Sequence, residues 1–499
     1  MTPKPRLRST ASPIGLEYRA CPTFEETDFE EREVTIMSCH TSPFRWIVAL
    51  VAVALMMGAT AELQAQVAGG GQIAGVEVDP NGVLRTKVFL DRSGQLTKQR
   101  MAAARAQLDP NLARPSDLRL VSINRLEKVV GDRVKAAHGL TDEIRYLAGL
   151  TQITHVFFYP ESGDIVVGGP AEGFGHDVSG RVIGIHTGKA TLQLEDLVAA
   201  LRAYGPGGQR TNMIRVSIDP TPEGLQKMQE FLVRISGRIV PSDAQKIATG
   251  LRENLGKQIV TIEGVSPKTH FAQVLVEADY RMKLIGIGLE RPPVGIVSYV
   301  AKANPRDVAR NAMQRWYFTP NYDCVKVTDD EMAMQLVGEG VKLIGENELI
   351  GANGARAVAG RADRASQAFV KSFTAKYPEL ARVSPVYGQM RNLIDMAVAA
   401  AFIQERDYYG KAKWEMSVFR DESVYAIENY PAPTQVESAV NVIWKGNTLM
   451  TPIGGGVEIV AHSALATDRL IEDKGNKLAE QRSKLSIDLT EGQWWWDAK

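Results

Sequence analysis

The chain has 499 residues, with 58 Lys and Arg against 58 Asp and Glu, so its formal net charge is zero. Hydrophobic residues make up 44% and charged residues 23%, which is typical of a folded protein and argues against a disordered chain. The even charge balance lacks the clustered positive charge that nucleic-acid binding needs, so we expect no nucleic-acid partner.

A secretory signal is the clearest pattern in the chain. Arg45 precedes the apolar run 46–57, and small residues follow as far as Leu63-Gln64-Ala65. A charged start, a short apolar run and an A-x-A-like exit predict a signal peptide over residues 37–65, cut between Ala65 and Gln66. Residues 1–36 carry an acidic block, the wrong charge for the start of a signal. We therefore interpret residues 1–36 as a mis-called extension and Met37 as the initiator.

This signal predicts an exported protein of the periplasm, the cell envelope or the medium. The apolar run is shorter than the roughly 20 residues of a spanning helix, so cleavage is favoured. In the alternative, the signal stays uncleaved and residues 46–61 anchor the protein to the inner membrane, its one membrane contact. Cleavage would leave Cys324 as the one cysteine, which excludes an intramolecular disulfide.

The first predicted unit after the signal spans residues 95–208 and follows an exit segment, residues 66–94, with short strands. Apolar residues at three- and four-residue steps predict a helix that carries Leu118 and Val121 on its buried side. A hairpin with strands at 153–159 and 164–167 is expected next, because turn residues separate two β-prone runs. A helix at 194–204 closes the unit.

Residues 209–350 are predicted to form an α+β core unit. Its helices are expected at 222–235, 242–255 and 271–285. Its strands are expected at 213–218, 258–262, 295–301, 316–319, 324–327, 334–337 and 341–343. On the long helix 271–285 we expect Met282 in the core and Asp279 with Lys283 as an exposed pair across one turn.

The remaining chain is divided into a linker at 351–364, a helical unit at 365–430 and a C-terminal β-rich segment at 431–499 with a helix and a Trp-rich tail. Strands and helices do not alternate regularly, so the predicted fold class is α+β. It has mixed or antiparallel sheets, packed amphipathic helices and two or three units after the signal.

No stretch matches a motif that carries chemistry. Gly168-Gly169-Pro170 has Pro where a dinucleotide loop needs Gly, and the histidines lack the spacing of zinc ligands. Cys324 lies on an alternating strand as an inert thiol, and a metal at His176, Asp177 and His186 is disfavoured. We therefore predict no catalytic, cofactor-binding or metal-binding residue and no cofactor. Carboxylates such as Glu277 and Asp279 leave a two-carboxylate glycosidase open.

The C-terminal residues Trp494, Trp495 and Trp496 are the candidate contact site for a partner or ligand. Three adjacent indoles offer a large apolar area, and aromatic residues dominate interface energetics. Docking of this tail onto its own domain and a platform that faces a carbohydrate are the two alternatives.

Five strings between residues 146 and 320 carry a family resemblance. They are residues 146–150, 156–161, 164–174, 278–283 and 315–320. Together they resemble the secreted planctomycete proteins that carry domain of unknown function 1598, over roughly residues 117–345. The resemblance implies an exported protein and transfers no activity and no site residue.

Two functions of different classes follow from the sequence. The favoured one is a non-catalytic extracytoplasmic or cell-envelope protein with a binding or structural role, whose partner is an envelope protein or a polysaccharide. The alternative is an extracytoplasmic hydrolase that acts on polysaccharide or peptide. An enclosed cleft with paired carboxylates, or Cys324 beside a histidine, would favour the hydrolase; exposed Trp on a shallow surface would favour binding.

Overall fold

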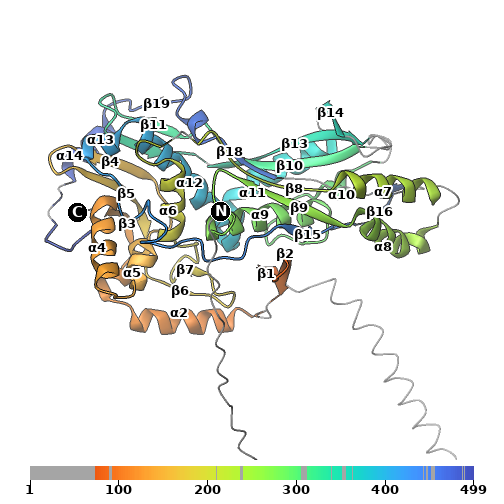
Figure 1. Ribbon diagram of the computed structural model, residues 1–499, viewed down its shortest axis with the longest axis horizontal. Coiled ribbons are helices and arrows are strands. Elements are labelled where there is room, and N and C mark those ends of the chain that lie inside the picture. The colour runs from red at the N-terminus through yellow and green to blue at the C-terminus, as the bar shows by residue number, and fades with distance from the viewer. Residues whose placement is uncertain are drawn as a thin grey trace, which may run out of the picture. The chain divides into compact units, whose positions relative to one another are not determined.

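The computed structural model describes residues 73–498 (Figure 1). Gaps in the description fall at 89–90, 92, 209–210, 236–239, 305–311, 339, 351–355, 362–363, 442, 446–447, 451–455, 486 and 488. The predicted extension 1–36 and the signal with its Ala65–Gln66 cleavage site lie outside the described residues. Contacts divide the chain into residues 1–66 and 67–499. All the parts of the chain predicted beyond residue 95 therefore lie in the second of these two units. The predicted boundaries between those parts stay predictions.

The fold is α+β with mixed sheets, as predicted. Among the described residues the larger sheet has nine strands, and β18 lies near its middle, antiparallel to β8 and parallel to β10. The strands in spatial order are β1 (Ile73–Val78), β2 (Val83–Val88), β15 (Gln435–Glu437), β9 (Lys257–Glu263), β8 (Ile214–Asp219), β18 (Gly456–Ile459), β10 (Ala312–Pro320), β13 (Val341–Ile350) and β14 (Arg356–Arg361).

A second sheet has seven described strands and contains the predicted hairpin, with Tyr159 paired to Asp164 across a turn that ends at Gly163, where φ is 70°. Its order is β19 (Ile471–Glu472), β11 (Val325–Val327), β12 (Ala333–Leu336), β4 (His155–Tyr159), β5 (Asp164–Ala171), β3 (Ser116–Ser122) and β20 (Trp495–Asp497). Two small sheets pair β6 (Phe174–His176) with β7 (Val182–Gly184), and β16 (Ile443–Lys445) with β17 (Thr448–Met450).

The helices begin where the sequence supplies caps. Thr221 accepts a hydrogen bond from Gly224 N at 2.9 Å and Pro222 occupies the first turn of α7. The described α-helices are α2 (Gln95–Gln107), α3 (Pro110–Ala113), α4 (Ile123–Lys135), α5 (Asp142–Arg145), α6 (Leu194–Ala203), α7 (Pro222–Arg234), α8 (Ala244–Leu255), α9 (His270–Gly286), α10 (Tyr299–Lys302), α11 (Arg364–Val383), α12 (Pro385–Glu405), α13 (Tyr408–Ala412) and α14 (Lys477–Lys484).

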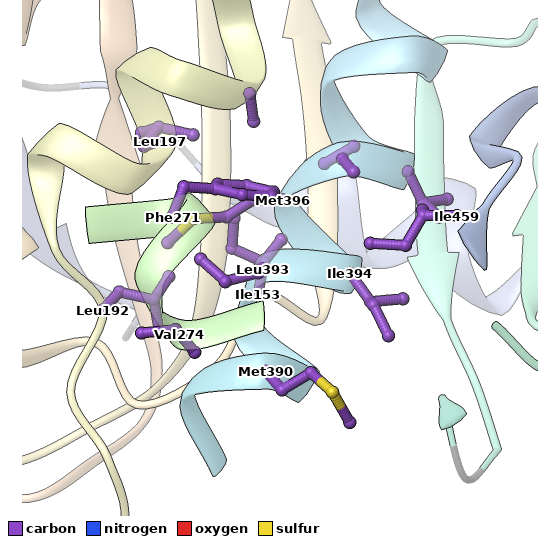
Figure 2. Close-up of a cluster of buried hydrophobic side chains, with 14 of the residues drawn as sticks. Ile153, Leu192, Leu197, Phe271, Val274, Met390, Leu393, Ile394, Met396 and Ile459 are labelled. Carbon is purple, nitrogen blue, oxygen red and sulfur yellow. The ribbon is translucent and has the colours of Figure 1, made fainter. Parts of the chain in front are cut away.

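Helix α12 is the centre of the core. It contacts α6, α9 and α11, while α9 also contacts β8, β18 and β10 of the larger sheet. Figure 2 shows Leu197 of α6, Phe271 of α9 and Met396 of α12 in one buried cluster. The same cluster includes Val167 of β5 and Ile459 of β18, so both large sheets share one apolar core.

Three local predictions were wrong. Leu118 and Val121 lie on strand β3, where Val121 pairs with Val167, and not on a helix. Apolar residues a few positions apart occur both on a buried strand and on one face of a helix. The spacing of Leu118 and Val121 therefore did not distinguish the strand from a helix. Residues 295–301 form no strand, because α10 begins at Tyr299. Within the predicted linker, Arg356–Arg361 forms β14.

Helix α9 is buried on every side, which corrects the prediction for its charged residues. Met282 is fully buried, as predicted, but so is Asp279, and Lys283 is only 6% exposed. The pair is formed, with Lys283 Nζ 2.9 Å from Asp279 Oδ2. Burial raises the pKa of Asp279 to about 6 although the Lys283 ammonium opposes that shift. The pair is therefore an internal ion pair, enclosed because α6, α12 and the larger sheet surround α9.

Over the part of the chain that the structure describes, no helix is both long and apolar enough to span a membrane.

Candidate functional site: a polar cleft at the starts of α6 and α9

A cleft of about 670 Å³ opens where helices α6 and α9 begin. Its walls come from β1, β2, α5, the turn at residues 179–182 and the irregular segment 425–430, with one contribution from α12. The helices that bring these residues together pack on the apolar cluster of Figure 2, which includes Val274 of the cleft lining and Phe271 and Met390, the chain neighbours of His270 and Gln389. The position of the cleft thus follows from the packing of α6, α9 and α12.

A histidine–aspartate pair joins the two helix starts. His270 is the first residue of α9, and Asp196 lies in the first turn of α6. The His270 Nδ1 atom lies 2.9 Å from Asp196 Oδ2, so Nδ1 carries the proton and donates it to the carboxylate. The His270 Nε2 atom lies 3.4 Å from the side-chain amide nitrogen of Gln193. Burial alone would lower the pKa of His270, but the Asp196 carboxylate, helped by Glu195, raises that pKa above its ordinary value.

Glu195 extends this pair toward the segment 425–430. It accepts a hydrogen bond from the Tyr430 hydroxyl at 2.7 Å, and the Tyr430 ring lies 5.7 Å from the His270 ring, centre to centre. Burial raises the pKa of Glu195 and the neighbouring Asp196 adds to that rise, while His270 and the Tyr430 hydroxyl partly offset it. Residues far apart in the chain therefore form two hydrogen-bonded pairs, which meet at the neighbouring residues Glu195 and Asp196.

A second charged group lies along α9. Arg181 donates from Nη2 to Glu277, and Glu277 also lies 3.3 Å from Arg281 Nη1. Arg281 in turn donates to Glu290 at 2.7 Å. Buried ions of this kind are tolerated when each is paired. The chain of pairs holds Arg181 at the cleft wall although its own segment, residues 179–182, is a turn.

Gln389 is the contribution of α12 to the cleft. It is 3% exposed, and its Oε1 accepts from Arg181 Nε at 2.9 Å. The orientation of the amide is fixed, because a guanidinium has only donors and must face the oxygen. The Nε2 atom is buried and has no acceptor among the described residues. A buried donor without an acceptor costs about 1–3 kcal/mol, so an acceptor brought by a ligand would be favourable here.

The segment with Tyr425 and Tyr430 is irregular, and side chains from two helices hold it in place. Arg202 of α6 donates to the carbonyl oxygens of Phe419 at 2.6 Å and Tyr425 at 2.7 Å. Glu127 of α4 accepts from the backbone N–H groups of Val418 and Phe419, both at 2.8 Å. These bonds give a loop wall of the cleft the support that regular structure would otherwise supply.

The chemistry of the cleft is mixed. Its lining supplies phenols, side-chain amides, carboxylates and cations, which are groups that orient a polar ligand. His270 with Asp196 has the form of a general base. The serine of the lining, Ser179, donates its hydroxyl to Asp177 at 2.6 Å and not to His270. In the described part of the chain, then, the histidine has no hydroxyl nucleophile bonded to it.

The predicted tryptophan site lies elsewhere, on the edge of the seven-stranded sheet. Trp494 is 4% exposed, and Trp495 pairs with Val121 as part of β20. The Trp495 indole donates to Glu143 and its ring lies 4.6 Å from the Arg119 guanidinium carbon. Trp496 packs in a small cluster with Phe157. The tail is thus docked on its own chain, and contact of these residues with a partner stays a prediction.

The other residues discussed from the sequence are not brought together. Cys324 is buried, and burial, with the Asp395 and Asp323 carboxylates adding to the effect, raises the pKa of its thiol to about 12. His176 bonds the Gly180 carbonyl at 3.1 Å, whereas His186 lies 3.0 Å from Arg105 Nη2. Among the residues that the structure describes, no three His, Cys, Asp or Glu side chains are grouped so that they could hold a metal ion.

Sequence reasoning missed the cleft. Asp196 and His270 are 74 residues apart, and nothing in a single sequence places two such residues side by side. The available signal was positional, since Asp196 lies in the first turn of the predicted helix 194–204 and His270 directly precedes the predicted helix 271–285. Charged side chains at a helix start are so common that this signal alone does not single them out.

Comparison with known proteins found a family match within one segment of this fold. The family model described as "Protein of unknown function (DUF1598)" matches residues 216–299, which confirms the resemblance to that family over this segment. The match covers β8 from Val216, α7, α8, β9 and α9, so it includes His270 and Glu277 but not Asp196 or Gln389. The comparisons with curated proteins and with solved structures found no match.

Proposed function

We propose that this chain is an exported, non-catalytic protein of the cell envelope that binds a segment of polysaccharide in the polar cleft. The observation that carries the proposal is the lining of the cleft, which combines the rings of Tyr146, Tyr425 and Tyr430 with the amides of Gln193 and Asn429. Aromatic faces cover the apolar C–H faces of a sugar ring, while amides bond its hydroxyls. The volume of the cleft, about 670 Å³, falls in the range of ligand sites.

Export is the second part of the proposal and rests on the signal pattern of residues 37–65. N-terminal sequencing of the protein recovered from the envelope tests it. A mature chain that begins at Gln66 supports the proposed cleavage. A chain that retains the apolar run 46–57 would convert the signal into an inner-membrane anchor, and one that retains the acidic block at 24–33 would contradict the start at Met37.

Binding is tested with purified protein on an array of neutral and acidic oligosaccharides, followed by titration calorimetry on those that bind. We expect Tyr430→Ala to weaken binding at least tenfold because the ring is lost, and Tyr430→Phe to keep most of the affinity. Tyr322→Ala is the matched control, because Tyr322 does not line the cleft. Absence of binding to every saccharide, or equal loss in the control, would overturn the proposal.

The Asp196–His270 pair favours a second candidate, a hydrolase that uses His270 as the base for a water molecule. The raised pKa of His270 strengthens it as a proton acceptor. The test is chromatography of oligosaccharides and of peptides after incubation with the protein and with His270→Ala. Products formed by the parent and not by His270→Ala would establish the hydrolase. Unchanged substrates would leave binding as the function.

A further inference from the structure

The buried amide of Gln389 marks one point in the cleft where a ligand must supply a hydrogen-bond acceptor. Its Oε1 accepts a hydrogen bond from Arg181 Nε at 2.9 Å. Its Nε2 has no acceptor among the described residues, although the residue is only 3% exposed. The side chain lines the cleft. A donor in this position can donate either to a neutral oxygen, such as that of a hydroxyl, or to a negative one, such as that of a carboxylate.

The charges around Gln389 favour the negative oxygen. The lining has three cations, Lys87, Arg145 and Arg181, against two carboxylates, Glu195 and Glu277, and Lys87 also lies 3.0 Å from the Glu77 carboxylate outside the lining. The Glu277 carboxylate is already shared by two arginines, one of which, Arg281, lies behind the lining. His270, whose pKa is raised, adds positive charge at mildly acidic pH, balanced there by Asp196.

The helix starts act in the same direction. Residues at the N-terminal ends of both α6 and α9 line the cleft, and these helices have 10 and 17 residues. Each helix N-terminus carries a partial positive charge that favours an anion. Glu195 and Asp196, in the first turn of α6, offset the partial positive charge at the N-terminus of that helix. The described first turn of α9 carries no acidic residue.

We propose that the cleft recognises a uronic acid, a sugar that carries a carboxylate, and that Gln389 Nε2 donates to this carboxylate beside the Arg181 guanidinium. This inference rests on the proposed function, since it names the class of saccharide that the same cleft binds. It makes Gln389 the residue that distinguishes acidic from neutral polysaccharide. Arg181 holds the amide in the orientation that presents Nε2, and Glu277 holds Arg181.

The test compares ligands that differ only in the carboxylate. Tetrasaccharides of galacturonate, alginate and hyaluronan are each paired with the carboxyl-reduced form, in which the carboxylate has become a neutral hydroxymethyl group, and calorimetry measures both affinities. We expect at least one acid to bind at least tenfold more tightly than its reduced form. Equal affinities within every pair that binds would overturn the inference and leave the binding function intact. No binding by either member of any pair would remove the proposed function as well.

Variants assign the preference to Gln389. We expect Gln389→Leu to abolish the difference between acid and reduced form, and Gln389→Glu to reverse it through charge repulsion. Gln404→Leu is the matched control: Gln404 lies on the same helix, outside the cleft, with its Nε2 already donated to the Gly205 carbonyl at 2.9 Å. An acid preference that survives in folded Gln389→Leu or Gln389→Glu would show that another group reads the carboxylate. If neither variant folds, the parent's acid-to-reduced ratio decides the inference alone.

Discussion

Arg119 of β3 donates from Nε to Asp497 Oδ1 at 2.8 Å, so two residues 378 positions apart form one ion pair at the sheet edge. The Arg119 side chain is fully buried and also donates to the Ala148 carbonyl at 2.7 Å. The Trp495 ring covers the guanidinium. The C-terminal tail therefore supplies both the carboxylate and the aromatic ring that contact the buried Arg119 guanidinium.

Asp497→Ala should destabilise the protein because it leaves the Arg119 guanidinium buried without its carboxylate. Removal of one partner of a buried pair costs about 3–5 kcal/mol, and the lower end applies here since 21% of the Asp497 side chain is exposed. Urea unfolding followed by tryptophan fluorescence measures the change. Glu491→Ala is the control from the same tail, because Glu491 is 95% exposed and should change stability very little.

Lys283→Met should be strongly destabilising, because it strands the Asp279 carboxylate in the core. We expect a loss of about 3–5 kcal/mol for the single variant, and a smaller loss when Asp279→Leu is added, since no buried charge then remains. Thermal and urea unfolding of the two variants provide the comparison. A single variant that loses less than about 0.5 kcal/mol would behave like an exposed pair and would contradict the burial of α9.

Asp395 should make the protein more stable as the pH falls from about 7 to about 4. Burial raises the pKa of Asp395 from its ordinary 3.8 to about 7, although Arg391 opposes the shift. The folded state therefore binds a proton that the unfolded state releases, and this group's contribution falls by about 1.4 kcal/mol for each pH unit above 4, up to about 7. The measurement is the difference in unfolding free energy between parent and Asp395→Asn at several pH values. A constant difference across that range would refute the assignment.

Asp196→Asn should lower the pKa of His270 relative to the parent. The carboxylate that raises it is gone, while the burial that lowers it remains. In the parent, His270 stabilises the fold below pH 6.5 and that contribution is lost as the pH rises through its raised pKa. Carbon-13 NMR of labelled histidine rings, assigned with His270→Gln, follows both titrations. An unchanged pKa in Asp196→Asn would mean that Glu195, not Asp196, controls the histidine.

Local signals in the sequence predicted much of the fold. The helix patterns at 222–235 and 271–285 placed α7 and α9, and the turn before Asp164 placed the β4–β5 hairpin. The wrong predictions concern places where tertiary packing, and not the local sequence pattern, decides the environment of a residue. Asp279 looked exposed because a charged residue on a helix usually is, and only the elements packed around α9 make it internal. The cleft was out of reach for the same reason, because it depends on which helix ends converge.

The position of β18 sets the order in which this chain can be assembled. Residues 456–459 fill the gap between β8, at residues 214–219, and β10, at residues 312–320. A chain leaves the ribosome N-terminus first. The larger sheet therefore lacks its middle strand, β18, until almost the whole chain has been synthesised. Such non-local pairing folds slowly. The segment matched by the family, residues 216–299, contains β9 and most of β8 but not β18, so on its own it would leave the β8 edge that β18 covers unpaired.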